Sequence, residues 1–384
     1  MRWGKTFLTP HILYIGGEDH NLRIPFMLLL RERGFRVTAA GTGDGAPFAQ
    51  AGLEFRRFRF ERYVNPLADL TAIRDLAKLL AEVRPDFAQT CDTKPSVLVP
   101  LAARQVPGVR VVRNINGRGW LYSSGSPAAL VLRPIYRVLH QVAAHSTVKT
   151  VFEIRDDEAF FERHRLIGSG GSLVIPGAGI DVERFDDALA QAPPPSQLRA
   201  ELGLNEVDVV MTVTRVTRQK GIPTLLEAAA QVCKERPNTR FVLVGPRETE
   251  GRLAVSQAEI DDHAPYVVAI GPRSDVPALL KLADLFAFPT EYREGIPRAL
   301  LEAALAEVPT VTTSMPGCCE VIRDGWNGFQ VPPHSPRVLA ERILEMLRDR
   351  TAAQEMAARA RVLVRAKFSL RVVVDHYAAL YNDL

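Results

Sequence analysis

The sequence has 384 residues, of which 47% are hydrophobic and 24% are charged, and its 48 basic and 44 acidic residues give a net charge of +4. This is the composition of an ordinary globular protein with about two domains, and it excludes disordered, collagen-like and disulfide-scaffold chains. So small a net charge does not by itself indicate a nucleic-acid-binding protein.

The cysteines and the apolar segments indicate the cellular setting. None of the four cysteines has the paired spacing of zinc ligands, so we expect free thiols in a reducing compartment. The N-terminal apolar run is shorter than a signal peptide requires, and nowhere is there an apolar stretch of about 18 residues. We therefore expect a cytoplasmic protein without a transmembrane helix.

In the first half of the chain, short β-branched runs alternate with helical patterns, which is typical of βαβ units and a parallel sheet. The expected strands are 11–17, 35–41, 55–60, 86–91, 109–115, 147–152 and 172–177. The expected helices include 22–33, 70–83, 96–105 and 128–144.

The alternation stops at a segment with three consecutive prolines and then restarts. The strands expected beyond it are 208–216, 240–246, 266–272, 284–290, 310–314 and 328–333. The expected helices include 221–237, 276–283, 296–307, 335–349, 351–366 and 370–383.

These elements predict an α/β fold of two tandem doubly wound, Rossmann-like domains. We expect an N-terminal domain over 1–185, a Pro-rich linker over 186–205 and a C-terminal domain over 206–365. Ligands of such sheets bind at the carboxyl ends of the strands, so the candidate active site is a cleft across which the two domains face each other.

Gly16 and Gly17 follow the first expected strand and precede a helix, where glycines let backbone amides approach a phosphate or a sugar. The surrounding GGEDHN matches neither the dinucleotide-binding fingerprint nor the P-loop. An ordinary tight turn is the alternative, with equal weight.

A basic loop follows the strand expected at 208–216. It contains Arg215, Arg218 and Lys220, and Gly221 opens the next helix. Cations beside a glycine at a helix N-terminus are groups that bind a diphosphate, arginine by paired hydrogen bonds and lysine as a point charge. The alternative is a solvated basic loop, which the position at the carboxyl end of a strand disfavours.

Two glutamates, Glu294 and Glu302, follow the strand expected at 284–290. Glu294 precedes a helix and Glu302 lies about two turns inside it, so both can face one crevice. One carboxylate would accept ribose hydroxyl groups and the other would lie at the reacting sugar. Such spacing is weak evidence alone, but Glu302 lies in an apolar stretch, where a glutamate usually has a partner.

The segment 93–152 contains no Asp or Glu but eight Lys or Arg residues. Within it, Arg133 and Arg137 interrupt an apolar helical pattern, as in segments that lie at a membrane surface. This segment is either a face for anionic lipid or a diphosphate acceptor, or a core helix whose arginines extend to solvent.

The chain as a whole resembles the retaining, nucleotide-sugar-dependent glycosyltransferases of group 1 (family 4), which have the GT-B fold. The most specific resemblance is in VTRVTRQKGI, FVLVGP, SDVPALLKLADLFAFPT, EYREGIPRALLEAAL and PGCCEVIRDGWNGFQVPP. In the N-terminal half, members that act on undecaprenyl-diphosphate sugars or make surface polysaccharide resemble DTKPSVLVPLAAR, NINGRGW and VIPGAGIDVERF.

The resemblance implies roles for individual residues. Arg215 and Lys220 would hold the donor diphosphate, and Glu302 the ribose. Glu294 would contact the donor sugar or stabilise the reacting centre. The remaining binding positions that the family implies, for donor or acceptor, are Gly16, Gly17, Gly245, Gly271, Arg273, Gly295 and Ile296. The final helix, 366–384, would pack back on the N-terminal domain.

One position departs from the family pattern. Many relatives have His-Gly where this chain has Asn116-Gly117, and that histidine is often given a role at the reacting sugar. An asparagine donates hydrogen bonds but does not accept a proton at neutral pH. Asn116 is therefore a candidate catalytic position at which a general-base role is in doubt.

We expect transfer of a hexose or N-acetylhexosamine from a nucleotide sugar, UDP-linked by resemblance, to a lipid-linked or polysaccharide acceptor. No cofactor and no nucleic-acid partner is expected, and peripheral contact with an anionic membrane would involve 93–152. The sequence has no Asp-x-Asp motif for a metal-bridged diphosphate, so we expect metal independence. The alternatives are a non-hydrolysing UDP-sugar epimerase and a degenerate protein that only binds sugar nucleotides.

Overall fold

The computed structural model describes residues 9–17, 20–58, 61, 65–119, 122, 127–177 and 179–384. The chain divides into two compact units. Unit 1 ends at Gly179 and resumes with Leu370–Leu384, and unit 2 is Ile180–Ser369. The division after Gly179 lies ahead of the boundary expected at 185, and the chain returns to unit 1 at Leu370, within the segment expected to do so.

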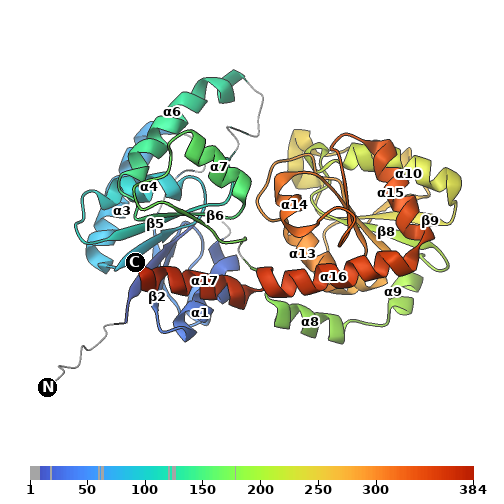
Figure 1. Cartoon of the computed structure of the whole chain (residues 1–384), viewed down its shortest axis with the longest axis horizontal. Coiled ribbons are helices and arrows are strands. Elements are labelled where there is room, and N and C mark those ends of the chain that lie inside the picture. Colours follow the sequence, from blue (N-terminus) through green and yellow to red (C-terminus); the bar gives the residue numbers. More distant parts are fainter. Residues whose placement is uncertain are drawn as a thin grey trace. The chain divides into compact units, whose positions relative to one another are not determined.

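Unit 1 contains a parallel sheet of seven strands in the order β3-β2-β1-β4-β5-β6-β7 (Figure 1). Its strands are β1 (His11–Ile15), β2 (Arg36–Gly41), β3 (Glu54–Arg57), β4 (Phe87–Thr90), β5 (Arg110–Ile115), β6 (Lys149–Phe152) and β7 (Ser172–Val174). The order reverses between β1 and β4, so the carboxyl ends of these two strands are the expected ligand-binding position.

The helices of unit 1 cover this sheet. They are η1 (His20–Arg23), α1 (Ile24–Glu32), α2 (Ala46–Gln50), α3 (Pro66–Val83), α4 (Pro95–Ala103), α6 (Pro127–Ala144), α7 (Arg155–Arg163) and α17 (Leu370–Asp383). The last of these packs beside α1 (Figure 1), with Tyr377 and Tyr381 buried in the core. The Tyr377 ring meets Phe26 edge to face at a centroid distance of 5.2 Å. This aromatic packing anchors the strandless C-terminal helix in unit 1.

Unit 2 has a parallel sheet of six strands in the order β10-β9-β8-β11-β12-β13. Its strands are β8 (Asp208–Val213), β9 (Thr239–Val244), β10 (Val267–Ala269), β11 (Leu285–Phe288), β12 (Thr310–Thr313) and β13 (Phe329–Val331). Here the order reverses between β8 and β11. Both units are therefore parallel-sheet, Rossmann-like α/β structures, as the sequence predicted.

The helices of unit 2 begin earlier than expected. They are α8 (Val182–Gln191), α9 (Pro195–Glu201), η2 (Arg218–Lys220), α10 (Ile222–Glu235), η3 (Glu248–Leu253), α11 (Gln257–Asp261), α12 (Val276–Leu282), α13 (Arg298–Leu305), α14 (Pro316–Val321), α15 (Pro336–Arg348) and α16 (Arg350–Phe368). No helix in the part of the chain that the structure describes has the length and apolarity needed to cross a membrane.

Helices α8 and α9 occupy much of the segment 186–205, where the sequence predicted a linker. The Asp181 side chain caps α8 by accepting from the Arg184 N–H at 3.0 Å. The triproline opens α9, because Pro195 stands in its first turn, where the missing N–H costs no helical hydrogen bond. Leu198 of α9 is buried in the core of unit 2, so this segment is part of the folded unit.

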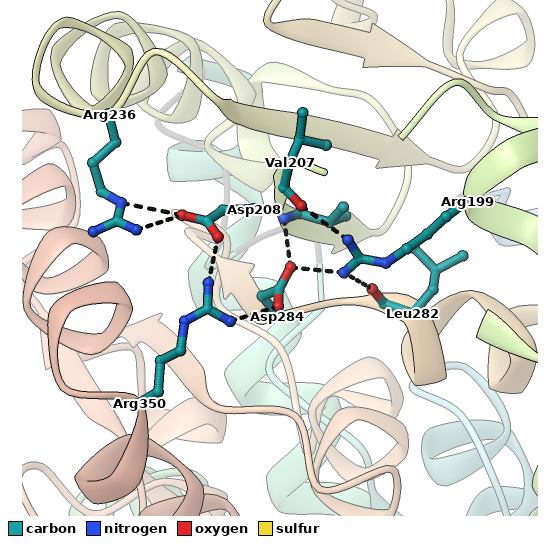
Figure 2. A network of polar contacts seen from close by, with 8 residues as sticks. Arg199, Val207, Asp208, Arg236, Leu282, Asp284 and Arg350 are labelled. Atoms are coloured by element: carbon teal, nitrogen blue, oxygen red, sulfur yellow. Dashed lines mark hydrogen bonds and ion pairs between the residues drawn. The ribbon is translucent and has the colours of Figure 1, made fainter. Parts of the chain in front are cut away.

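The amino-terminal edge of the unit 2 sheet carries a network of carboxylates and arginines (Figure 2). Asp208 begins β8 and Asp284 directly precedes β11. Their carboxylates pair with three arginines from α9, the end of α10 and the start of α16, which are Arg199, Arg236 and Arg350. Because the network lies at the strand ends opposite those that bind ligands, its role is to join these helices to the sheet.

Asp284 is the centre of this network. Its Oδ2 accepts from Arg199 Nη2 and from the Val209 N–H, both at 2.8 Å, and its Oδ1 accepts from Arg350 Nη1 at 2.9 Å. Burial raises the pKa of Asp284, but these hydrogen bonds and the arginine charges outweigh burial and hold it below its usual value.

Asp284→Asn should lower the free energy of unfolding of unit 2 by about 1–3 kcal/mol at neutral pH, because an amide N–H₂ then faces arginine donors. The lowered pKa means that Asp284 stabilises the fold above the unfolded-state pKa of about 4 and loses this effect as pH falls through the folded-state value. The difference between wild type and variant should therefore shrink in acid, as measured by urea unfolding.

Asp275→Asn is the matched control, because Asp275 pairs with Arg273 in a more exposed ion pair. We expect a change within about 0.5 kcal/mol for this variant. Equal destabilisation by the two substitutions would contradict the role assigned to the network.

Candidate active site

The unit 2 site begins where β8 turns toward α10. Gly221 has φ of +69°, and a Cβ at this position would overlap the carbonyl oxygen of Pro289. Only glycine combines this left-handed backbone with such a close approach. The loop after β8 therefore lies directly against the chain that follows β11, and the Glu291 N–H donates to the Gln219 carbonyl at 3.0 Å.

This contact brings Lys220 to Glu294. The Lys220 Nζ lies 2.7 Å from Oε1 and 2.8 Å from Oε2 of Glu294. The Thr290 hydroxyl donates to the same Oε1 at 3.1 Å, and the Lys220 side chain is only 8% exposed. The structure thus joins two residues that the sequence predicted separately, one as a diphosphate ligand and one as a group at the donor sugar.

A second carboxylate, Glu291, lies in the same chain segment and was missed by the sequence analysis. It accepts from the Thr224 hydroxyl at 2.6 Å and pairs with Nδ1 of His334 at 2.9 Å. Its side chain is 11% exposed. Thr224 lies in the first turn of α10, close in sequence to the predicted Lys220, and could have drawn attention to this site. His334 comes from the loop after β13, and no sequence spacing links it to Glu291.

The two arginines of the basic loop have carboxylate partners of their own. Arg215 pairs with Glu250 at 2.9 Å, and Arg218 pairs with Glu259 at 2.6 Å. Hydrogen bonds from the Ser256 backbone and hydroxyl, together with Arg218, lower the pKa of Glu259 to about 2. The three cations of the loop are therefore bound to three different carboxylates, so the cluster that the sequence predicted is spread out.

The glycines after β9 and β10 meet each other. The Gly245 N–H donates to the Gly271 carbonyl at 2.9 Å, and a Cβ on Gly245 would overlap the carbonyl oxygen of Thr214, just after β8. Arg273, two residues on, makes an ion pair with Asp275. Gly245 and Gly271 thus lie close to the end of β8, while the Arg273 guanidinium pairs with a carboxylate two residues along the chain.

The predicted site residues between Gly295 and Glu302, which precede or lie on α13, have different surroundings. Glu302 on α13 accepts from Arg298 Nε at 2.8 Å, one turn earlier, so it has the partner that its apolar neighbours predicted. The Gly295 carbonyl lies where a Cβ on Gly317 would be, which brings the start of α14 against this segment. The Ile296 side chain packs against the core of unit 2.

In unit 1, the glycines after β1 use their amides within the protein. The Gly16 N–H donates to the Ala40 carbonyl at 3.0 Å, and the Gly17 N–H donates to Asp92 Oδ2 at 2.8 Å. Both amides are therefore bonded within unit 1 in this structure, which is what the tight-turn alternative expects. What glycine supplies at position 16 is space, because a Cβ there would overlap the imidazole of His20.

His20 and Asn116 are further polar groups at this edge of the unit 1 sheet. Burial lowers the pKa of His20 to about 4, so its imidazole is neutral at neutral pH, and its Nε2 lies 3.1 Å from the Tyr14 carbonyl oxygen. Asn116 follows β5, and its buried Oδ1 has no hydrogen-bond partner among the described residues. Both His20 and Asn116 are therefore neutral hydrogen-bonding groups, and the Asp92 carboxylate of this edge is bonded to the Gly17 amide.

Two family models match the chain. "Glycosyl transferases group 1" matches residues 196–363, and "Glycosyl transferase 4-like domain" matches residues 27–165. Together they include most of both units. The chain is a group 1 glycosyltransferase.

This glycosyltransferase is 24% identical to the Campylobacter jejuni N,N'-diacetylbacillosaminyl-diphospho-undecaprenol alpha-1,3-N-acetylgalactosaminyltransferase over 96% of each chain. It is 26% identical to the Escherichia coli UDP-Gal:alpha-D-GlcNAc-diphosphoundecaprenol alpha-1,3-galactosyltransferase, over 70% of this chain and 68% of that enzyme. The crystal structure of Anabaena HepE in complex with UDP has a TM-score of 0.78 at 20% identity and covers 97% of this chain and 100% of its own. This last likeness shows the GT-B fold.

Gly221→Ala should destabilise unit 2 of the glycosyltransferase more than Gly203→Ala. Both glycines have positive φ, +69° and +67°, so either alanine costs about 1–2 kcal/mol of backbone strain. A Cβ has open space at Gly203 but overlaps the Pro289 carbonyl at Gly221, which should add about 1–3 kcal/mol. Urea unfolding measures both; equal losses would show that the close approach at Gly221 is not required.

Proposed function

We propose that this enzyme transfers a hexose or N-acetylhexosamine from a UDP-sugar to a lipid-linked or polysaccharide acceptor, with retention of the anomeric configuration. The observation that carries the proposal is the buried Lys220 ammonium, held with Glu294 at the carboxyl ends of β8 and β11. This is the edge at which a doubly wound sheet binds its ligand. The names of the Campylobacter and E. coli relatives support the acceptor class.

Lys220 supplies the fixed positive charge for the donor diphosphate. An ammonium has three N–H donors, and Glu294 takes up only part of this capacity. Arg215 is about half exposed and lies in the same loop, so its guanidinium can exchange Glu250 for phosphate oxygens. Both groups would stabilise the negative charge that develops as the diphosphate leaves.

The two glutamates of the segment after β11 would act on the sugar side of the donor. Glu302 would accept hydrogen bonds from the ribose hydroxyl groups, and Glu294 would contact the donor sugar while it orients Lys220. Glu294 already accepts from Thr290, which fixes the direction of its carboxylate. Gly271 would leave room for the nucleoside, because a Cβ at this position has no neighbour within 4 Å, whereas Gly245 lets the chain after β9 approach Thr214.

Retention requires the acceptor hydroxyl to attack the anomeric carbon on the face from which the diphosphate departs. The bond to the diphosphate oxygen breaks as the bond to the acceptor oxygen forms, and the hydroxyl proton passes to the leaving phosphate. The protein would then supply orientation and charge rather than a nucleophile. Asn116 would hydrogen-bond to the reacting sugar without exchanging a proton.

We further propose that no metal ion takes part, because Lys220 and Arg215 neutralise the diphosphate directly. The test of the whole proposal is an assay with a panel of UDP- and GDP-sugars and a polyprenyl-diphosphate-linked sugar, in the presence of EDTA. We expect transfer from a UDP-sugar and, by NMR of the product, retained configuration. Epimerised donor, binding without turnover, or activity only after EDTA is removed would each contradict part of the proposal.

Lys220→Ala should lower the transfer rate by about 10²–10³, the loss typical of one preorganised donor at a developing charge. Arg218→Ala is the matched control, because Arg218 lies in the same loop but is more than half exposed and pairs with Glu259. Single-turnover rates for both folded variants decide. Equal rates for Lys220→Ala and wild type would remove Lys220 from the donor site.

Glu302→Gln should weaken nucleoside-diphosphate binding by about tenfold or more, because a charged hydrogen-bond acceptor for the ribose is lost. Glu294→Gln should instead depress turnover by about a hundredfold with a smaller change in binding. Glu227→Gln, an exposed glutamate on α10, controls for loss of a surface charge. Calorimetry measures the change in binding, and single-turnover kinetics measures the change in rate. If Glu302→Gln and Glu294→Gln both bind and turn over like Glu227→Gln, neither glutamate has a role in the donor site.

A further inference from the structure

Some cations of the acid-free segment 93–152 have partners elsewhere in unit 1. Lys94 pairs with Asp69 at 2.6 Å, and Arg118 pairs with Asp157 at 2.8 Å. The cations of the segment that bind carboxylates or backbone carbonyl oxygens are Lys94, Arg110, Arg113 and Arg118. Acidic residues from elsewhere in unit 1 thus pair with Lys94 and Arg118, two of the eight cations.

Helix α6, within this segment, has an apolar outer face. Exposed residues recur in pairs at every fourth position along the helix. They are Leu130, Val131, Pro134, Ile135, Val138 and Leu139, and the five large ones are between 42% and 72% exposed. We call these six residues the α6 outer face. Spacings of three and four residues place them on one side of the helix.

The opposite side of α6 is more polar than the outer face. It packs against α4 and buries Tyr136 and His140 together with small alanines. His140 is 0% exposed, and burial lowers its pKa well below the usual value. Core packing therefore fixes which side of α6 faces outward. A surface helix of a water-soluble protein normally turns its apolar side to the core and its polar side to water, so α6 has the opposite arrangement.

Arginines lie beside the outer face. The Arg133 guanidinium is 5.1 Å from the centroid of the Tyr122 ring, and Arg137 Nε donates to the Tyr122 hydroxyl at 2.9 Å. Both arginines are half-buried, so their charges lie between the core and the apolar face. α6 contains no Asp or Glu. Tyrosine and arginine at the border of an apolar face are typical of structures at a membrane interface.

We propose that the α6 outer face lies in the interface of a lipid bilayer, with Arg133 and Arg137 near the lipid phosphates. This rests on the proposed function, in which the acceptor is lipid-linked. Two copies of α6 packed together would bring these arginines toward each other with no carboxylate on the helix to neutralise them. A lipid surface supplies both the apolar layer and the anions.

The test is co-sedimentation of the full chain with vesicles of phosphatidylcholine and phosphatidylglycerol. Val131→Ser, Ile135→Ser and Val138→Ser together should lower the partition coefficient by about tenfold or more, because each removes an apolar side chain from the interface. Val362→Ser is the matched control, since Val362 is 68% exposed on α16 of unit 2. It should leave partitioning unchanged.

The substitutions are at exposed positions, so circular dichroism and thermal unfolding should match wild type. Wild-type protein that does not sediment with the vesicles, or a triple variant that sediments as well as wild type, overturns the proposal. Sedimentation velocity tests whether a second copy of the chain covers this face instead. If the wild type is a dimer, the triple variant is a monomer and vesicle partitioning is unchanged, the α6 outer face belongs to a dimer interface.

Activity separates this proposal from the proposed function. The triple variant should transfer sugar normally to a short-chain, water-soluble acceptor and more slowly to a polyprenyl acceptor embedded in vesicles. Equal loss with both acceptors would overturn a role in membrane contact. If no acceptor supports transfer, the proposed function fails, and vesicle partitioning still decides the role of the α6 outer face.

Discussion

The ion pair between Lys220 and Glu294 is the interaction on which the proposed donor site of unit 2 depends. Its two residues are 74 positions apart and meet only because Gly221 lets one loop lie against the carbonyl of Pro289. The same two strands, β8 and β11, are joined at their other ends by Asp208, Asp284 and their arginines. The amino-terminal ends of β8 and β11 thus hold the helices to the sheet. Their carboxyl ends place the buried Lys220 near the more exposed Arg215 and Arg218.

The two units differ in the groups that they place at the reversal of strand order. Unit 2 has ammonium and guanidinium groups, which suit a diphosphate. Unit 1 has a neutral His20 and glycines whose amides are already bonded, one of them to Asp92 just after β4, and Asn116 follows the neighbouring strand β5. This contrast is the basis for proposing that unit 2 binds the donor through charge. In the mechanism proposed above, Asn116 needs no general-base role, because the leaving phosphate would take the proton.

Much of the fold could be predicted because β-branched runs mark the strands of a parallel sheet. The strands at 11–15 and 208–213 begin where the sequence placed them, and so the loops that follow them could be placed at the carboxyl edges. The segment 186–205 was mistaken for a linker, because a proline run is equally compatible with a helix start. Strand and helix patterns are local properties of the sequence, so they predicted where strands begin but did not show that the proline run opens a helix.

The partners of the site residues could not be predicted, because they come from distant parts of the chain. Arg215 and Arg218 looked like one cationic cluster until the folded chain showed Glu250 and Glu259 beside them. Two cations of the segment 93–152, Lys94 and Arg118, likewise meet Asp69 and Asp157, which lie outside the segment in sequence. Counting charges along a sequence says little about the charge of a surface.

A crystal structure of the full chain with bound UDP would show directly whether Lys220 holds the donor diphosphate. We predict diphosphate oxygens within hydrogen-bonding distance of Lys220 Nζ, with Arg215 turned from Glu250 toward the phosphates and the ribose hydroxyl groups on Glu302. A UDP molecule bound elsewhere, with Lys220 still held only by Glu294 and no phosphate near it, would contradict this account of the donor site.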